Sequence, residues 1–160
     1  MTETVLAITS MQTSEEASAF KTLNEEWIAR VFTVEAADRF ILDNPVRNIV
    51  DRGGDVLIAR AGGSIVGCAA LVPTGAGVFE LSKMSVAPEC RGRGYGRRII
   101  LAAIRRAREL GAASLFLGSS TKLPNAVHLY ESVGFKHVSV EQIGPMPYAR
   151  ADVFMELELK

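Results

Sequence analysis

The sequence predicts a single α/β (α+β) domain in which an antiparallel run of strands leads into one strand–loop–helix unit. Three strand-like apolar stretches follow one another between residues 56 and 86, and glycine-rich turns join them. A helix is expected before them, because Phe20, Leu23 and Trp27 recur at helical spacing. After residue 86, a glycine-rich loop leads into a second helical stretch.

The first half of the chain is expected to begin with a short strand at residues 5–8. Thr13 and Glu16 have the spacing of a capping box, which predicts the start of the first helix. Pro45 suits the first turn of another short helix. The remaining elements of this half are expected to be a helix at 34–42 and strands at 56–60, 64–72 and 78–86.

The second half is expected to alternate helices and strands. Gly111 is placed to end the helix that follows the glycine-rich loop, and Gly134 is placed to end the next one. The expected elements are helices at 96–110 and 124–133 and strands at 113–118, 135–140 and 153–159.

Composition limits the classes of partner. The chain has 160 residues, 48% of them hydrophobic, which fits one domain over residues 1–160. Its 18 basic residues equal its 18 acidic residues, so the overall charge favours neither nucleic acid nor an anionic membrane. Arginines are nevertheless concentrated between residues 91 and 108, which favours a small anionic ligand over a polymer.

The two cysteines, Cys68 and Cys90, have neither a CxxC pattern nor the spacing of metal ligands, so no metal is predicted. The N-terminus lacks the pattern of a secretory segment, and the longest apolar run, at residues 65–72, is too short to cross a bilayer. We therefore expect a reduced, cytoplasmic protein without a membrane anchor.

The glycine-rich loop has the features of a phosphate site. Alternating glycines leave backbone N–H groups uncovered, and the helix that follows directs the positive end of its dipole toward the same point. A basic surface turn is the alternative interpretation. A P-loop is excluded because Arg97 and Arg98 stand where Lys and Ser or Thr are needed, and the spacing does not fit a dinucleotide fingerprint. The loop is Arg91-Gly92-Arg93-Gly94-Tyr95-Gly96.

Together with a second motif, this loop resembles the GNAT superfamily of N-acetyltransferases. The family pattern is Arg or Gln, two residues, Gly, one residue, then Gly or Ala, and residues 91–96 satisfy it. The second motif places Asn125 five residues before Tyr130, with Gly134 and Phe135 after them. The resemblance covers residues 55–140 well. It implies a mostly antiparallel sheet of six or seven strands, splayed at the fourth strand and flanked by about four helices.

The resemblance also implies that acetyl-CoA is the co-substrate. Its pyrophosphate is expected on the loop amides, its pantetheine arm along the strand that ends at residue 86, and a polar contact at Asn125. Backbone amides of that strand would stabilise the thioester oxygen. The cofactor-binding residues that it implies are Met84, Val86, Arg91, Gly92, Arg93, Gly94, Tyr95, Gly96, Arg97 and Asn125.

Two residues are candidates for proton transfer. Tyr130 matches the position at which the family often places the acid that protonates the departing thiolate, although a tyrosine on an apolar helix face is also commonly part of the core. Glu80 is the candidate general base, because strand alternation puts it on the same face as Ser82 and Met84. A solvated or ion-paired Glu80 is the alternative. Neither cysteine has the neighbours of an acyl carrier, so direct attack in a ternary complex is favoured over a ping-pong scheme, although Cys90 adjoins the basic loop and its reactivity is left open.

The resulting hypothesis is an N-acetyltransferase that acts on a primary amine of a small molecule. A non-catalytic acyl-CoA-binding module is the alternative, and a nucleic-acid-binding protein is a third option that the zero net charge disfavours. By the resemblance, Glu35 and Asp38 lie where the acceptor site is shaped, as amine ligands or solvated charges. Tyr148 and Arg150 are placed at its rim, and a homodimer is left open.

Overall fold

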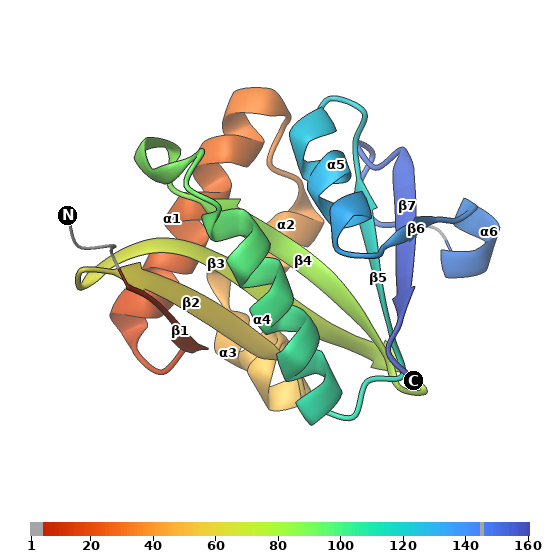
Figure 1. The fold of residues 1–160 in the computed structure, drawn as a ribbon, viewed down its shortest axis with the longest axis horizontal. Helices are drawn as coiled ribbons and strands as arrows, with labels where there is room; N and C mark the ends of the chain where they lie inside the picture. Colours follow the sequence, from red (N-terminus) through yellow and green to blue (C-terminus); the bar gives the residue numbers. More distant parts are fainter. Residues whose placement is uncertain (1–4, 145) are drawn as a thin grey trace.

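A seven-stranded sheet forms the centre of the computed structural model, which describes residues 5–144 and 146–160 (Figure 1). The strand order is β1-β2-β3-β4-β5-β7-β6, and only β4 and β5 pair in parallel. The strands are β1 (Leu6–Ser10), β2 (Asp55–Ala61), β3 (Ser64–Gly75), β4 (Val78–Val86), β5 (Ser114–Ser119), β6 (Lys136–His137) and β7 (Val153–Glu158).

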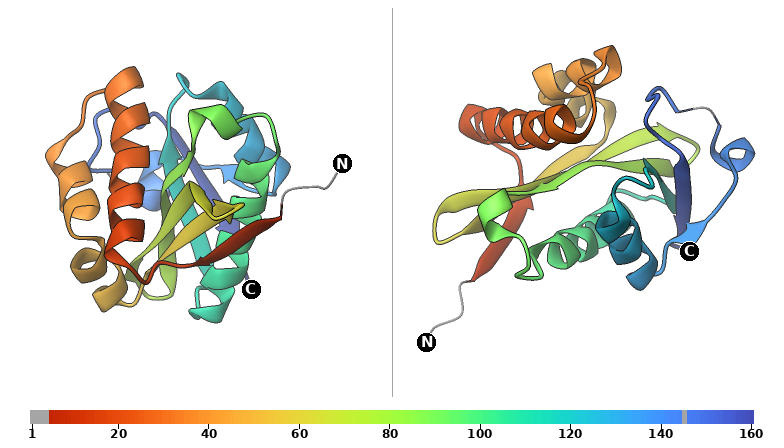
Figure 2. Two further views of the ribbon diagram at one scale, coloured as in Figure 1. Left: turned by 90° about the vertical axis from the view of Figure 1, so that its left-hand side faces the viewer. Right: turned by 90° about the horizontal axis from the view of Figure 1, so that it is seen from above.

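Helices cover both faces of this sheet, with α1 and α2 on one face and α4 and α5 on the other (Figure 2). The helices are α1 (Ser14–Val31), α2 (Ala36–Asp43), α3 (Pro45–Asn48), α4 (Tyr95–Glu109), α5 (Pro124–Ser132) and α6 (Val140–Ile143), with 3-10 turns at Val50–Arg52 and Pro88–Cys90. The predicted fold class is confirmed, and the four helices of eight or more residues match the expected number.

Each face of the sheet has its own hydrophobic core. On the α1 side, Phe20 and Ile28 of α1 are fully buried against Ile58 of β2. On the other side, Ile99 and Ile100 of α4 are fully buried among strand residues. Burial of such side chains contributes roughly 1.5–3 kcal/mol each. The two cores hold β4 firmly between helices, and β4 is the strand that positions the site.

The starts of α1 and α4 differ in a way that matters for function. At α1 the predicted capping box forms, because the Thr13 hydroxyl accepts from the Glu16 amide at 3.1 Å and the Glu16 carboxylate accepts from the Thr13 amide at 3.1 Å. At α4 the cap residue is Gly94, in a left-handed conformation with φ 78°. Within the described chain no side chain caps α4, so its first amides are available to an anion.

The splay expected at the fourth strand is present. β4 and β5 pair only from Val78 to Glu80, where Glu80 lies opposite Phe116. Beyond this point β4 continues to Val86 alongside β3, while β5 continues to Ser119 alongside β7. The sheet therefore opens between the far ends of β4 and β5.

A β-bulge at Lys83 and Met84 changes which way β4 side chains point. Register is Cys68 to Ser85 and then Ala70 to Ser82, so two residues of β4 lie opposite one of β3. Lys83 has a positive φ of 53°, a conformation that costs a non-glycine residue of order 1–3 kcal/mol. Strict alternation along β4, on which the sequence interpretation relied, is therefore interrupted inside the site.

One predicted strand is much shorter than expected. The apolar pattern at residues 135–140 predicted a strand of six residues, but only Lys136–His137 pair with β7. The chain leaves the sheet after the Val138 amide donates to the Phe154 carbonyl at 2.9 Å, and Val140 then begins α6. Phe135 packs beside Tyr130 in the core, with ring centroids 5.9 Å apart, so its apolar side chain serves core packing and not a longer strand.

Candidate active site

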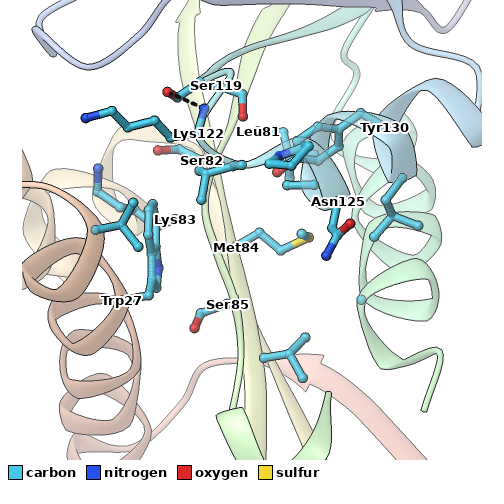
Figure 3. A pocket seen from close by; sticks show the side chains of 18 of the residues that line it. Trp27, Leu81, Ser82, Lys83, Met84, Ser85, Ser119, Lys122, Asn125 and Tyr130 are labelled. Atoms are coloured by element: carbon cyan, nitrogen blue, oxygen red, sulfur yellow. Dashed lines mark hydrogen bonds between the residues drawn. The ribbon is translucent and has the colours of Figure 1, made fainter. Parts of the chain in front are cut away.

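A cleft of about 550 Å³ lies in the opening between β4 and β5 (Figure 3). It receives side chains from α1, β4, the glycine-rich loop, the end of β5, α5 and residues 148–151. Every cofactor-binding or catalytic residue expected from the sequence borders this cleft, with the exception of Arg93. The volume is in the range typical of small-molecule sites.

The glycine-rich loop has the curled backbone that its composition predicts. Gly92 and Gly94 have φ values of 81° and 78°, which disfavour any residue with a β-carbon. A β-carbon at Gly96 would lie 3.2 Å from a methyl group of Leu129, so glycine also allows α4 to approach α5 closely. The loop thus presents bare backbone at the uncapped start of α4, and this arrangement suits a phosphate ligand.

The arginines around the loop do not all face the cleft. Arg91 and Arg97 line it, and the Arg97 guanidinium donates to the Ser132 hydroxyl of α5 at 3.0 Å. Arg98 is directed elsewhere, since its guanidinium donates to the Leu6 carbonyl of β1 at 3.4 Å. Arg93 is exposed and does not border the cleft.

Met84, Asn125 and Tyr130 converge on the centre of the cleft from opposite walls (Figure 3). Met84 packs with the α4-side core, and Asn125 stands at the start of α5, one residue after Pro124. Val86 lines the same wall as Met84. The glycine-rich loop borders the same cleft, so the two motifs of the sequence meet at the space where β4 and β5 diverge.

Tyr130 combines a core position with access to the cleft. Its ring packs edge-on against Phe135, and the residue also borders the cavity. Burial raises the pKa of Tyr130 to about 12, so its hydroxyl keeps its proton near neutral pH. The position of Tyr130 is thus compatible with both interpretations from the sequence, a proton donor to the thiolate and a core residue.

Glu80 lies at the vertex where β4 and β5 separate. Burial raises the pKa of Glu80 from 4.5 to about 7, although the nearby Lys83 charge acts in the opposite direction. Glu80 and Ser82 border a small cavity against α2, whereas Met84 packs on the α4 side. The expectation that Glu80 and Met84 share a face is wrong, because the bulge reverses the alternation between them.

A buried ion-pair network adjoins the cleft on the α2 side. Asp38, which is fully buried, accepts from Arg150 at 2.6 and 2.9 Å and from the Lys83 ammonium at 2.7 Å. Lys83 also donates to the Tyr148 hydroxyl at 3.0 Å and lies 4.2 Å from the centre of its ring. Glu35 accepts from Arg150 at 3.4 Å. Asp38 is therefore a structural anchor, neither a solvated charge nor an amine ligand.

The network shifts the protonation of its members in opposite directions. Burial alone would raise the pKa of Asp38, but the Arg150 and Lys83 partners outweigh it and hold that pKa at about 2. Burial lowers the pKa of Lys83, and Asp38 opposes this effect. One unused signal for this network is that Lys83 continues the alternate row of β4 residues that begins with the apolar Phe79 and Leu81. Its partners lie 45 and more residues away, so spacing could not identify them.

The described residues hold neither a metal cluster nor a membrane-spanning helix. No group of three or more His, Cys, Asp or Glu side chains in them is arranged to hold a metal ion. Within residues 5–144 and 146–160, no helix is both long and apolar enough to span a bilayer.

Comparison with known proteins agrees with this geometry. The chain is 30% identical over 159 residues to an uncharacterized N-acetyltransferase of Schizosaccharomyces pombe, a match that covers 96% of this chain and 95% of the relative. An acetyltransferase of the GNAT family from Staphylococcus aureus superposes with a TM-score of 0.87 at 19% identity, covering 98% of this chain and all of the other.

A Bacillus subtilis acetyltransferase solved in complex with CoA superposes with a TM-score of 0.69 at 18% identity, over 98% of this chain and all of the other. The sequence model of the acetyltransferase (GNAT) family matches residues 16–135, which include β4, the glycine-rich loop and all of α5. The chain therefore belongs to the GNAT family of acetyltransferases, and it is an N-acetyltransferase that uses an acyl-CoA.

Proposed function

We propose that this enzyme moves an acetyl group from acetyl-CoA to the primary amine of a small molecule, by direct attack in a ternary complex. The observation that carries the proposal is the single cleft that joins the glycine-rich loop, the free edge of β4 and Glu80. A loop for the coenzyme and a base for the amine are thereby brought together, with the free Cys90 in the wall beside the loop. Cys68 is fully buried, which raises its pKa to about 12, so it does not suit an acyl carrier.

In this proposal the coenzyme lies along β4 and ends at the loop. The pyrophosphate accepts from the amides at the start of α4, with Arg91 and Arg97 beside it. The pantetheine arm lies along the edge of β4 that β5 leaves uncovered after Glu80. A backbone amide near Met84 then stabilises the thioester oxygen as negative charge develops on it.

Glu80 serves as the general base. The amine nitrogen must be neutral to attack the thioester carbon, and its proton passes to the Glu80 carboxylate directly or through one water. Because its pKa is about 7, Glu80 is ionised for a useful fraction of molecules near neutral pH and still accepts a proton readily. As the new C–N bond forms, the C–S bond breaks and the thiolate leaves.

Tyr130 stabilises the departing thiolate. Its pKa of about 12 exceeds that of a free thiol, near 8.5, so complete proton transfer to sulfur is uphill by about 5 kcal/mol. The phenol therefore acts chiefly through a hydrogen bond to the developing thiolate. Release of CoA thiol from acetyl-CoA, measured against a panel of amines, tests the function as a whole. Saturable acetyl-CoA binding without thiol release from any amine would favour a non-catalytic acyl-CoA module instead.

Gly94→Val is expected to weaken acetyl-CoA binding about 10- to 100-fold. A β-branched residue disfavours φ 78°, and its side chain occupies the space in front of the α4 amides. Titration calorimetry with acetyl-CoA measures the change. Gly62→Val is the matched control, since Gly62 also has a positive φ, of 58°, but lies in the β2–β3 turn away from the cleft. Equal affinities for both variants would contradict the role of the loop.

Tyr130→Phe is expected to lower kcat about 10- to 100-fold while leaving the affinity for acetyl-CoA nearly unchanged. The phenylalanine ring keeps the packing against Phe135 but cannot donate to sulfur. Stopped-assay turnover and calorimetry together separate the two effects. Phe135→Leu provides a packing control, because it disturbs the same aromatic pair without removing a hydroxyl. An unchanged kcat in Tyr130→Phe would exclude the residue from the reaction.

A further inference from the structure

Cations dominate the part of the cleft that lies away from the glycine-rich loop. Four basic residues line it there: Arg30, Lys83, Lys122 and Arg150. Among the described lining residues, Glu80 is the one acidic side chain, and its raised pKa leaves it partly neutral near pH 7. An acceptor that enters this region meets more positive than negative groups.

The carboxylates of the buried network do not cancel this asymmetry at the cleft surface. Asp38 and Glu35 both contact Arg150, but neither is among the residues that line the cleft. The two acids stand behind Arg150 and Lys83 and fix their positions. A ligand in the cleft therefore meets the cations first.

Both anchored cations keep donors to spare. Arginine has five N–H donors, and the described contacts of Arg150 account for three of them: two to Asp38 and one to Glu35. Lysine has three donors, and Lys83 uses one on Asp38 and one on Tyr148. A guanidinium held by a carboxylate on one side presents its other N–H groups in a fixed orientation, which suits a second carboxylate.

Lys122 completes the arrangement from the opposite wall. It lies just before α5 and reaches across the cleft toward α1, with its ammonium 5.6 Å from the centre of the Phe32 ring (Figure 3). In the described structure no carboxylate lies within ion-pair distance of it, although Lys83 and Arg150 are both paired. Arg150 approaches the same Phe32 ring at 5.7 Å, so the two cations flank one aromatic side chain.

We propose that the acceptor is an amine that also carries a carboxylate, and that Arg150 and Lys122 bind this carboxylate while the amine lies toward Glu80. This inference rests on the proposed acetyl transfer and specifies its substrate class. Trp27, Phe32 and Tyr148 line the same region, so an apolar or aromatic substituent on the acceptor has surfaces to contact. Polyamines and aminoglycosides are disfavoured, because their several positive charges would lie among the cations of the wall.

The test compares acceptors that differ at one group. L-Phenylalanine, its carboxamide and phenethylamine are assayed by thiol release with saturating acetyl-CoA, and spermine serves as the polycation. Because the amines differ in pKa, kcat/KM is expressed per concentration of neutral amine. The free carboxylate is expected to raise kcat/KM at least tenfold over the carboxamide and over phenethylamine. A preference for the carboxamide or for spermine would overturn the proposal and leave the proposed acetyl transfer standing.

Variants of Lys122 locate the effect without disturbing the buried network. Lys122→Met is expected to raise KM for phenylalanine about tenfold, with little change for the carboxamide or for acetyl-CoA, and Lys122→Arg should keep most of the preference. Lys136→Met removes an exposed lysine of β6 outside the cleft and is the matched control. An equal loss for phenylalanine and its carboxamide would mean that Lys122 does not bind the carboxylate.

A binding measurement separates failure of this inference from failure of the proposed function. Calorimetry in the presence of CoA compares N-acetyl-L-phenylalanine with its carboxamide, and it requires no turnover. Tighter binding of the carboxylate, reduced by Lys122→Met, supports the substrate class even if phenylalanine is acetylated slowly. Equal binding of the two compounds contradicts it, whereas absence of thiol release from every amine contradicts the proposed acetyl transfer.

Discussion

Asp38→Asn is expected to lower the free energy of unfolding by about 3–5 kcal/mol, because it leaves two buried cations without their shared carboxylate. Lys83 is 2% exposed and Arg150 is 13% exposed, so water cannot replace the lost partner effectively. The asparagine has nearly the same size, and the loss therefore reports charge and not packing. Urea unfolding at pH 7 measures the change.

Asp43→Asn is the matched control for this stability prediction. Asp43 ends the same helix and pairs with Lys21 at 2.9 Å, but both side chains are more than 40% exposed. Its unfolding midpoint should stay close to that of the unchanged protein, since exposed ion pairs contribute little. Similar losses in both variants would show that the Asp38 network does not act as a buried ion pair.

Acid titration offers a second readout of Asp38. Its folded pKa, about 2, lies below the unfolded value of about 3.8, so between these values the unfolded chain binds the extra proton. The stabilisation by Asp38 is complete above about pH 4 and is lost as the pH falls through 2. In Asp38→Asn this part of the acid dependence should be absent.

Glu80→Gln is expected to lower kcat about 10²- to 10³-fold at pH 8 and to remove the acidic limb of the pH–rate profile. Glutamine keeps the shape of the side chain but cannot accept the proton of the amine. In the unchanged enzyme this limb should fall near pH 7, the pKa to which burial raises Glu80. The measurement is kcat at saturating acceptor and acetyl-CoA between pH 5 and 9.

Ser82→Ala provides the control, because Ser82 lies beside Glu80 against α2 and does not titrate. Its acidic limb should stay near pH 7. A limb that survives in Glu80→Gln would assign the base to another group.

The raised pKa of Glu80 also affects stability. Between pH 4.5 and 7 the folded state binds the extra proton, so Glu80 destabilises the fold increasingly as the pH rises, by about 3 kcal/mol above pH 7. Glu80→Gln should therefore gain stability relative to the unchanged protein on going from pH 5 to pH 8.

Sequence reasoning anticipated the geometry of the proposed coenzyme half of the cleft better than that of the proposed acceptor half. Gly92 and Gly94 have the positive φ angles that only glycine adopts easily, so each of these residues by itself indicates the conformation of the loop. The strand at Val78–Val86 has the predicted bounds, because its apolar content and the following proline mark both ends. The catalytic roles of Glu80 and Tyr130 stay predictions until they are tested.

The acceptor half depends on contacts that no local pattern encodes. Asp38 meets Arg150 across 112 positions of sequence, and either residue alone has the appearance of an ordinary surface charge. The bulge was equally hidden, because a lysine with positive φ is held there by tertiary contacts and not by its own preference. Strict alternation therefore placed Glu80 and Met84 on one face, whereas the fold places them on opposite faces.

The β-bulge at Lys83 and Met84 separates two parts of β4 that the proposal gives different roles. The even-numbered residues before it, Glu80 and Ser82, turn to α2, whereas Met84 after it turns to α4. If the proposed sites hold, substitutions on the α2 side would change the acceptor region and leave the coenzyme contacts on the α4 side in place. In a regular strand Glu80, Ser82 and Met84 would lie in one row. A substitution that altered the acceptor region would then also disturb the bound acetyl-CoA.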